Sequence, residues 1–558
     1  MGKSSQIFWR VIRSYSIEEK VFSIILALLV VGGFVSGVTN LLKSPEIFFG
    51  ESGSYSEGIV SDRSATLNPL YVDFSDAGRD VSSLIFSGLT KYDPDLKAFK
   101  GDLADLTVSE DKRTYRFVLK PNEYWHDGVP VTADDVYFTF HDIIQNPDFQ
   151  NPVLKSNFEG VAVKKIDDRT VEFTLSRPNS FFITNLSVGI VPKHILGSVA
   201  AVDLPYDNFN LKPVGTGPYK VDSPMEITND GRQRVLLSVF NSYYGDHPKV
   251  KNIRFNVYPD AASLLKEKGV LNVIAKVPVS IYDEISKTGR FSFLNYELPQ
   301  YTAIFFNMDS AALKKSKVRL ALQKSVDKSL LLKQLRNKTV VDTPLLELNQ
   351  SDWIYKMNLD EAKGALFDSG YAMPKGGVYR KDSKGAVMKL GLLVRQYDDG
   401  TPQAAENKTI AEFFRKTWGD IGVEIDVQYA EAGEFNDRVQ QRDYDMVLTG
   451  QSLGYNYDTY SFWHSSQAGE SGLNLSNLRS FAADALIEKI RDTFDGGLKT
   501  LLLQDLAKEI SQEIPALFLF RPSYVFASDG KVKGISLDNM AFVSDRFAHV
   551  DRWCVNCQ

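Results

Sequence analysis

The chain's most informative stretch is YRFVLKPNEYWHDGVPVTADDVYFT, Tyr115–Thr139. It opens within TYRFVL, Thr114–Leu119, whose aromatic and β-branched residues predict a strand. The Gly, Pro, Asn and Asp residues of Asn122–Pro130 predict a turn. Thr132 and the two aspartates that follow predict the capped, acidic first turn of a helix, because apolar residues continue at helical spacing beyond them. This order of elements indicates a fold that mixes strands and helices.

The same alternation of strand-like and helix-like patterns continues on both sides and predicts an α/β or α+β architecture. The other predicted strands are Thr170–Leu175, Val235–Phe240, Arg254–Val257, Ala303–Phe306, Lys389–Val394, Glu424–Val427, Met446–Leu448 and Ala516–Phe520. The other predicted helices are Ser316–Leu335, Leu359–Phe367, Thr409–Trp418, Ala482–Thr493 and Leu498–Glu513. Because 558 residues exceed what one hydrophobic core supports, we expect two or more lobes.

Composition narrows the possible partners. The net charge is −6 and no run of Lys and Arg occurs, which argues against nucleic acid as a partner. Hydrophobic residues make up 43% of the chain and charged residues 24%, as in ordinary globular proteins. The only two cysteines, Cys554 and Cys557, form a C-x-x-C near the C-terminus. At an extracytoplasmic chain end this spacing favours a local disulfide or a tail without a role over a metal or redox site.

A long uncharged run near the start predicts a membrane anchor. Val21–Leu42 reads VFSIILALLVVGGFVSGVTNLL, which as a helix spans a bilayer core of about 30 Å. Basic residues precede it, whereas after Lys43 the next basic residue is Arg63. Because Lys and Arg mark the cytoplasmic side, residues 1–20 are expected to form a cytoplasmic tail and the body to lie outside.

The alternative interpretation of this run is a cleaved signal peptide. The small residues Gly32, Gly33, Ser36 and Gly37 near its end are compatible with cleavage. The apolar part of a signal peptide is usually about 7–15 residues long, which is shorter than this run. A retained single-pass anchor in the cytoplasmic membrane is therefore favoured, with the main domain on the periplasmic or extracellular side.

Catalytic and metal motifs are absent from the sequence. There is no GxSxG, HExxH or GxxxxGK[ST], and the six histidines show no metal-ligand spacing. Gly215-Thr-Gly217-Pro218 is better interpreted as a tight turn than as a phosphate loop. We therefore expect no catalytic residues, no metal, no cofactor and no enzymatic activity.

Several stretches, in order along the chain, resemble one family. They are Ile85–Pro94, Tyr115–Thr139, Pro213–Tyr219, Asn241–Tyr244, Phe306–Met308, Lys317–Asp327, Leu359–Lys363 and Ser369–Tyr371. Tyr115–Thr139 resembles the family hallmark nearly residue for residue. The family is that of the extracytoplasmic solute-binding proteins of ABC importers for oligopeptides, dipeptides and nickel. The resemblance covers roughly residues 55–535.

The resemblance implies a two-lobed, periplasmic-binding-protein-like (type II) α/β fold. Lobe I is expected over 55–300, with an inserted subdomain at 96–207, and lobe II over 301–524. Residues 525–558 are expected to return to lobe I and end in a tail. The chain then crosses between lobes near Leu298–Thr302 and near Arg521–Val525, and these crossings form the expected hinge. A ligand in this fold lies between the lobes.

The resemblance also indicates candidate ligand contacts. In peptide-binding members a lobe II carboxylate pairs with the free ammonium of the ligand, and that position here falls on Tyr455, which is uncharged at neutral pH. The motif's second acidic position falls on Asp458. The full set of ligand-binding candidates is Trp125, Asn307, Gln451, Tyr455, Tyr457, Asp458 and Trp463.

Several of these candidates also have a purely structural interpretation. Trp125 is expected to pack beneath the Asp127–Gly128 turn, and Asp458 to cap a loop. Core packing explains Tyr457 and Trp463 as well as ligand contact does. Because Tyr455 carries no charge, the sequence leaves open whether a free peptide N-terminus is recognised.

Together these features predict a membrane-anchored, monomeric solute-binding component of an ABC importer. An extended peptide or similar solute is held through its main chain by strand-like pairing, which needs no catalyst. Nothing in the chain hydrolyses ATP, so the permease and the ATPase are expected on separate chains. The alternative is a ligand-sensing receptor or chaperone-like binder that uses the same fold without transport.

Overall fold

The computed structural model describes residues 53–61, 65–72, 75–335, 338–346, 354–398, 401–455, 457–470 and 472–557. The predicted anchor, Val21–Leu42, lies outside these ranges, as does the predicted tail of residues 1–20. Within the described ranges, no helix combines the length and the apolar character needed to cross a membrane.

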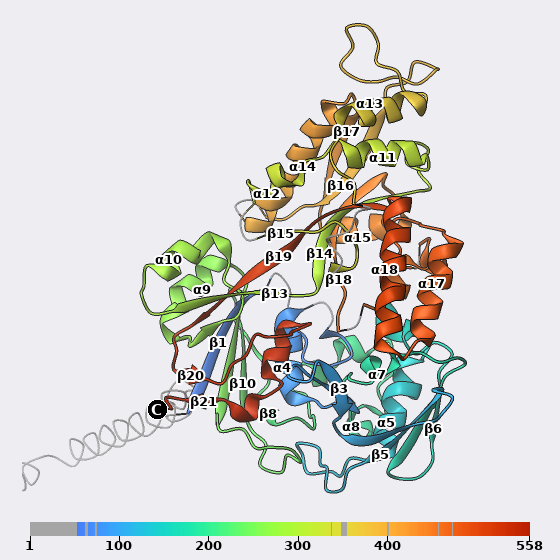
Figure 1. The fold of residues 1–558 in the computed structure, drawn as a ribbon. Coiled ribbons are helices and arrows are strands. Elements are labelled where there is room, and N and C mark those ends of the chain that lie inside the picture. The colour runs from blue at the N-terminus through green and yellow to red at the C-terminus, as the bar shows by residue number, and fades with distance from the viewer. Residues whose placement is uncertain are drawn as a thin grey trace, which may run out of the picture.

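Two lobes share one sheet, and Figure 1 shows them one above the other. The strand order is β17-β16-β18-β14-β19-β12-β1-β11-β10-β8, with β13 and β15 also pairing with β19 and β9 pairing with β10. The first part of β19 (Ala516–Ser528) pairs antiparallel with β14 (Gln300–Phe306) of the upper lobe. Its second part pairs with β13 (Ser292–Glu297) of the lower lobe. The chain therefore crosses between the lobes within β19 and between β13 and β14.

The upper lobe packs helices on both faces of its strands. Its other strands are β15 (Lys338–Val340), β16 (Lys389–Arg395), β17 (Glu424–Ala430) and β18 (Met446–Ser452). Its helices are α11 (Ser316–Lys324), α12 (Lys328–Leu332), α13 (Leu359–Asp368), α14 (Pro402–Gly419), α15 (Ala432–Gln441), α16 (Tyr460–Trp463), α17 (Phe481–Asp492) and α18 (Gly496–Glu513). Successive strand residues point to opposite faces, so Ile304 and Phe306 enter one core and Ala303 and Phe305 the other.

The lower lobe contains the remaining strands of the large sheet and a smaller separate sheet. Its strands in the large sheet are β1 (Ser54–Val60), β8 (Tyr219–Val221), β9 (Glu226–Ile227), β10 (Gln233–Val239), β11 (Asn252–Tyr258) and β12 (Val273–Ile274). The helices α4 (Asp76–Ile85), α9 (Ala261–Glu267) and α10 (Tyr282–Ser286) belong to the same part of the lobe. The smaller sheet has the strand order β4-β5-β7-β6, formed by β4 (Ala104–Val108), β5 (Thr114–Leu119), β7 (Thr170–Thr174) and β6 (Ala162–Lys165). The hairpin β2 (Thr90–Asp93) and β3 (Ala98–Gly101) and the helices α5 (Ala133–Tyr137), α6 (Pro152–Ser156), α7 (Phe182–Asn185) and α8 (Lys193–Leu196) complete this lobe.

The hallmark stretch folds as strand, turn and helix. Strand β5 has the predicted bounds, and Thr132 and Asp135 form a capping box before α5. The helix then continues as a π-helical segment, Phe138–Ile144. The turn docks on the chain near Gly215, where a Cβ atom would lie 2.0 Å from the carbonyl oxygen of Ile85. Only glycine fits at this position. The Gly-Thr-Gly-Pro sequence is therefore explained by a close approach of two backbone segments at a tight turn.

One predicted helix is wrong. Ser316–Leu335 is predicted as a single helix, but the structure divides it into α11 and α12. The break follows from capping, because the Asp327 side chain accepts a hydrogen bond from the N–H of Ser329 and starts a second helix. Apolar periodicity continues through the break and therefore does not reveal it.

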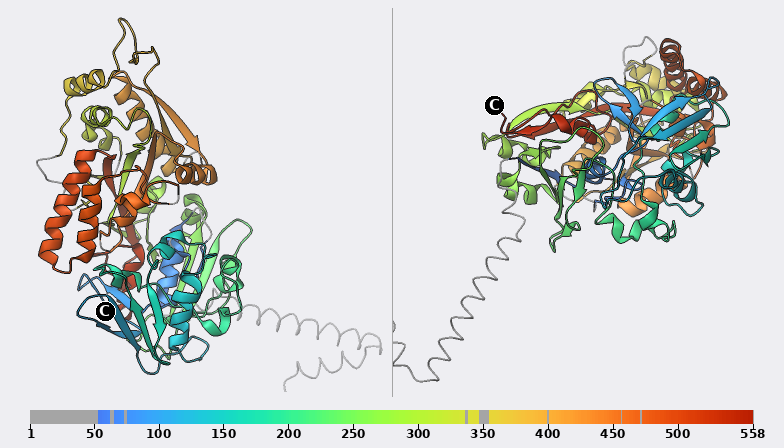
Figure 2. Two further views of the ribbon diagram at one scale, coloured as in Figure 1. Left: turned by 90° about the vertical axis from the view of Figure 1, so that its right-hand side faces the viewer. Right: turned by 90° about the horizontal axis from the view of Figure 1, so that it is seen from below.

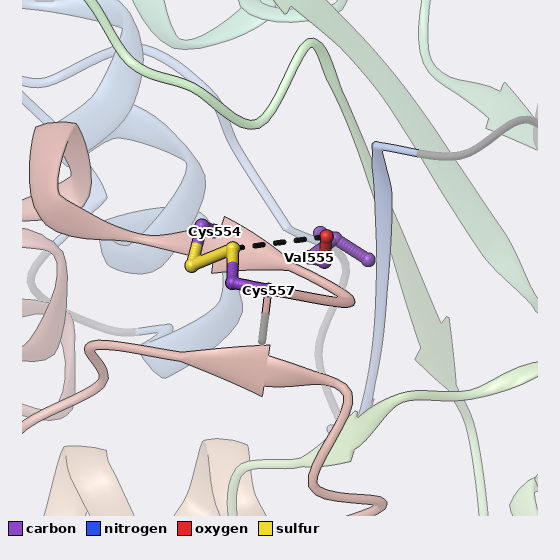
Figure 3. Close-up of a disulfide and its surroundings, with 3 residues drawn as sticks. All are labelled: Cys554, Val555 and Cys557. Carbon is purple, nitrogen blue, oxygen red and sulfur yellow. Dashed lines mark hydrogen bonds between the residues drawn. A yellow bond between two sulfur atoms is a disulfide. The ribbon is translucent and has the colours of Figure 1, made fainter.

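The C-terminal tail is joined to the body by a short strand pair. Strand β21 (Cys554–Val555) pairs antiparallel with β20 (Val532–Lys533). Cys554 and Cys557 form a disulfide, and the Cys557 sulfur lies 3.9 Å from the carbonyl oxygen of Val555 (Figure 3). The structure thus contains a local disulfide, which is one of the two interpretations that the sequence analysis favoured.

Candidate binding site between the lobes

The loop that follows β18 runs between the two lobes. It begins at the crossing strands, where the N–H of Leu453 donates to the carbonyl of Pro299 at 2.7 Å. It then passes Tyr455 and reaches Asp458 before α16. Four of the predicted candidates lie in or beside this loop, where they are close in sequence: Gln451, Tyr455, Tyr457 and Asp458.

Tyr455 extends from the upper lobe into an aromatic recess of the lower lobe. Its ring centre lies 4.6 Å from that of Tyr92, 5.0 Å from Phe99 and 5.1 Å from Phe542. Its hydroxyl donates to Asp545 Oδ1 at 2.8 Å. Burial and the nearby negative charge of Asp545 raise the pKa of Tyr455 well above its usual value. The side chain is therefore a neutral contact between the lobes.

Asp545 is a carboxylate that the sequence analysis missed. Its Oδ2 accepts hydrogen bonds from the N–H groups of Ala541 and Phe542 at 2.8 and 2.9 Å. Burial raises the pKa of Asp545 in spite of these bonds. The residue lies 90 positions from Tyr455 in the sequence, so no local motif indicates their contact.

Asp458 is held by an internal ion pair. Its Oδ2 lies 2.8 Å from Arg491 Nη2, and its Oδ1 accepts the N–H of Tyr460 at 3.3 Å. The Arg491 guanidinium also stacks over the Tyr460 ring at 3.9 Å. Tyr457 is half-buried and packs against the upper-lobe core. In this conformation Asp458 fixes the end of the loop, which is close to the loop-capping role expected for it from the sequence.

Gln451 and Trp463 lie inside the upper lobe near the crossing strands. The Tyr301 hydroxyl donates to Gln451 Oε1, and Tyr301 faces Gln451 across the β14–β18 pair. Gln451 is buried, and within the described residues its amide nitrogen has no hydrogen-bond partner. Trp463 is fully buried and packs against Phe305 and Phe518.

The two other candidates are placed away from the loop. Trp125 is fully buried in the lower-lobe core, and its indole N–H donates to Asp135 Oδ2 at 3.4 Å. The amide nitrogen of Asn307 donates to the carbonyls of Arg442 and Tyr444 at 3.2 and 3.0 Å. Both side chains thus contact the protein itself and support the backbone around them.

A second contact between the lobes involves the inserted subdomain and the paired helices α17 and α18. In Figure 2 these helices reach down to the lower lobe. Arg177 pairs with Glu488 at 2.8 Å, and the N–H of Ser180 donates to the carbonyl of Arg491 at 2.7 Å. Lys499 Nζ donates to Ser180 Oγ at 2.7 Å. The lobes therefore meet far from the crossing strands as well as beside them.

A polar cavity of about 220 Å³ opens beside this second contact. Its lining includes Asn157, Glu159, Arg177, Asn179, Glu488 and Arg491. Sites for drug-sized ligands usually enclose about 300–1,000 Å³, so this space suits one side chain or a few waters better than a whole extended ligand.

Charged residues also face the lobe boundary near the crossing strands. Lys276 Nζ lies 2.8 Å from Asp76 Oδ2, and 4.2 Å from the centre of the Tyr524 ring. Neither charged residue belongs to a motif that the sequence analysis recognised. Tyr524 lies in β19, the strand that both lobes share.

Within the described ranges, one group of residues has the spacing of a metal site: Asp93, Asp95 and His549. Lys100 already lies 2.7 Å from Asp93, and Arg552 lies 2.8 Å from Asp95. Both carboxylates are therefore paired with cations of the protein, which lowers the attraction of this group for a metal ion.

Comparison with known proteins identifies relatives of this chain. The sequence profile of the bacterial extracellular solute-binding proteins, family 5 (middle), matches residues 98–472. The oligopeptide-binding protein AppA of Bacillus subtilis is 26% identical over 490 residues, which cover 84% of this chain and 86% of AppA. The dipeptide-binding protein of Escherichia coli is 26% identical over 465 residues, covering 77% and 82%.

Solved structures show the same fold. AppA from Bacillus subtilis in complex with a nonapeptide superposes with a TM-score of 0.74 at 25% identity, covering 90% of this chain and 99% of AppA. NikZ from Campylobacter jejuni in complex with Ni(L-His) gives the same TM-score and identity, covering 90% and 100%. The two-lobed, periplasmic-binding-protein-like α/β fold is thereby confirmed.

Proposed function

Because this chain belongs to the bacterial extracellular solute-binding proteins of family 5, we propose that it captures peptides between its lobes for an ABC importer. It is a binding protein rather than an enzyme, and its family places it on the extracytoplasmic side. The permease and the ATPase are separate chains in this proposal, and the binding protein acts as a monomer.

The observation that carries this proposal is the way in which the lobes are connected. Among the described residues, β19 and the Glu297–Gln300 connection are the two segments at the crossing, and the loop containing Tyr455 lies between the lobes. Such an arrangement lets the lobes separate by bending at two short segments and close over a ligand. Relatives named for oligopeptide and dipeptide binding support a peptide as that ligand.

We propose that lobe I comprises residues 55–300, with the subdomain 96–207, and that lobe II comprises 301–524. The hinge then lies at Leu298–Thr302 and Arg521–Val525, and residues 525–558 return to lobe I. Of the predicted contacts, Gln451, Tyr455, Tyr457 and Asp458 are proposed to face the ligand. Trp125, Asn307 and Trp463 act through the backbone that they support.

The proposal includes a single-pass anchor at Val21–Leu42, which would keep the binding protein close to its permease. Its support is the uncharged run and the basic residues before it. If the anchor is retained, the chain stays in the membrane pellet after an alkaline carbonate wash. Release of the intact body into the supernatant would contradict it.

Native mass spectrometry of the purified full chain, compared with the same sample denatured, tests peptide capture. Binding proteins that enclose their ligand can retain it through purification, so a distribution of released peptide masses is expected. A single sharp adduct of non-peptide mass would instead show that the ligand is one dedicated solute and not a set of peptides. If no peptide is retained, a synthetic peptide library should be bound on addition, and failure to bind it would overturn the proposal.

A further inference from the structure

A charged pair on the lower lobe faces the place where the lobes meet. Lys276 follows β12 and Asp76 begins α4, and their side chains are 31% and 47% exposed. The ammonium of Lys276 donates to Asp76 Oδ2 at 2.8 Å. The two residues are 200 positions apart in sequence, so only the tertiary fold brings them together.

Tyr524 places this pair at the lobe boundary. The Lys276 ammonium lies over the Tyr524 ring, and the Tyr524 hydroxyl accepts a hydrogen bond from the side-chain amide of Gln300, the first residue of β14. Burial raises the pKa of Tyr524, and the positive charge of Lys276 lowers it. Tyr524 therefore links the Lys276 ammonium to the first residue of the upper-lobe strand β14.

Lys276 retains hydrogen-bonding capacity. An ammonium group has three N–H donors, and among the described residues the hydrogen bond that Lys276 makes is the one to Asp76. Burial disfavours the charged amine, but Asp76, Tyr524 and Tyr296 together outweigh it and raise the pKa of Lys276. The residue thus carries a positive charge with unused donors at the lobe boundary.

The charges around Asp76 favour an anionic partner over a cationic one. Lys276 lowers the pKa of Asp76 most strongly, and Arg79 on the next turn of α4 lowers it further. An added ammonium would therefore meet two cations beside one carboxylate. The charge of Glu406 is already matched by Lys338 at 2.8 Å. An added carboxylate would meet Lys276 with donors to spare.

We propose that Lys276 is a specificity-determining residue that binds the free carboxylate of the peptide, with Asp76 holding the ammonium in position. This inference rests on the proposed function, because it assigns the charged group that the peptide site recognises. A charge-assisted hydrogen bond of this kind corresponds to about a ten- to hundredfold preference for the carboxylate over a neutral amide.

Random-sequence peptide libraries of three to nine residues test this assignment. Three forms are mixed in equal amounts: unmodified, C-terminally amidated and N-terminally acetylated. The full chain is emptied of ligand, incubated with the mixture and analysed by mass spectrometry of the retained peptides. We expect the unmodified and acetylated forms to be enriched about tenfold or more over the amidated form.

The variants identify the residue responsible. Lys276→Met should remove the discrimination against the amide, and Lys276→Arg should keep most of it. Asp76→Asn should weaken binding but leave the carboxylate preferred. Lys287→Met, at an exposed lysine of the same lobe, serves as the matched control and should behave as the unchanged chain does. Circular dichroism and thermal melting verify that each variant is folded.

The outcomes separate the inference from the function on which it rests. Equal retention of amidated and unmodified peptides by the unchanged chain would overturn the role of Lys276 while leaving peptide capture intact. Discrimination against acetylation that disappears in Asp76→Asn would assign the pair to an ammonium instead. Failure to retain any of the three forms would remove peptide capture itself.

Discussion

Glu123 is an acidic residue whose side chain is buried in the folded protein. It lies in the turn of the hallmark stretch with 4% of its surface exposed, and neither carboxylate oxygen has a hydrogen-bond partner within the described residues. Burial raises its pKa from an ordinary 4.5 to about 9. The side chain is therefore protonated at neutral pH, and folding at that pH requires it to take up a proton.

Glu123→Gln should stabilise the protein at pH 7. The folded pKa lies above the unfolded one, so the unsubstituted chain loses stability as pH rises from about 4.5 towards 9. At pH 7 the loss is at most about 3 kcal/mol, at about 1.4 kcal/mol per pH unit. Chemical denaturation at pH 4 and pH 7 measures this loss. Relative to the unsubstituted chain, the variant should be more stable only at the higher pH. A gain of the same size at pH 4 would contradict this origin, and Glu110→Gln, at an exposed glutamate, is the control.

Tyr455 is the side chain that joins the two lobes beside the loop. Tyr455→Ala removes its packing on three rings and its hydrogen bond to Asp545, so the arrangement in which the lobes touch here should become less favourable by tenfold or more. Small-angle scattering of the ligand-free variant should show a larger radius of gyration. Tyr455→Phe keeps the ring, so its radius of gyration should lie between those of the unchanged chain and of Tyr455→Ala. A scattering profile identical to that of the unchanged chain would show that this contact does not hold the lobes together.

At the scale of elements, the segment 177–181 belongs to one lobe by sequence and packs with the other. Phe181 is 5% exposed and lies in the core formed with α17 and α18. Lys499 lies over its ring at 4.5 Å. The subdomain and these helices are thus joined by an apolar side chain as well as by polar contacts.

Phe181→Ala should loosen this junction selectively. Deleting a buried phenylalanine side chain costs about 3–5 kcal/mol, and part of that loss should appear as easier opening of the contact. Hydrogen exchange at the Ser180 N–H, which is bonded to the carbonyl of Arg491, should accelerate about tenfold or more. Phe367→Ala, at a phenylalanine that is 67% exposed, should leave this amide unchanged. Unaltered exchange at Ser180 in Phe181→Ala would show that the polar contacts alone hold the segment.

At the scale of the whole molecule, the two ends of the described chain meet through a buried charge cluster. Arg546, in the C-terminal segment, donates to Asp80 at 3.0 and 2.7 Å and also to Glu57 of β1. All three side chains are buried. Burial raises the pKa of Glu57 to about 7 and also raises that of Asp80, against the attraction of Arg546.

Arg546→Met should leave two uncompensated buried carboxyl groups and destabilise the protein by about 3–5 kcal/mol at pH 8. Without the arginine, the folded-state pKa values of both acids rise further above their unfolded values, so the penalty should shrink as pH falls towards 4. Denaturation curves recorded between pH 8 and pH 4 measure this penalty. The triple variant Glu57→Gln, Asp80→Asn, Arg546→Met should recover most of the loss. A penalty that stays constant with pH would point to lost packing instead.

Local sequence patterns and the family resemblance were enough to predict the family, the mixed architecture and many element bounds. Strand β5 and the capped start of α5 follow from local residue types, and the resemblance of Tyr115–Thr139 to the family hallmark leads directly to the two-lobed fold. The C-x-x-C spacing likewise made a local disulfide one of two favoured interpretations, and the structure contains it. These features depend on neighbours along the chain, which a sequence displays.

Which distant side chains meet could be learned from the folded structure alone. Asp545 reaches Tyr455 across 90 positions, and Lys276 reaches Asp76 across 200. The break between α11 and α12 and the burial of Trp463 were also outside the reach of local patterns. Contacts of this kind join segments that lie far apart along the chain, either within one lobe or across the lobe boundary. Their partners are set by the shape and register of whole lobes, and no local period or motif in the chain records them.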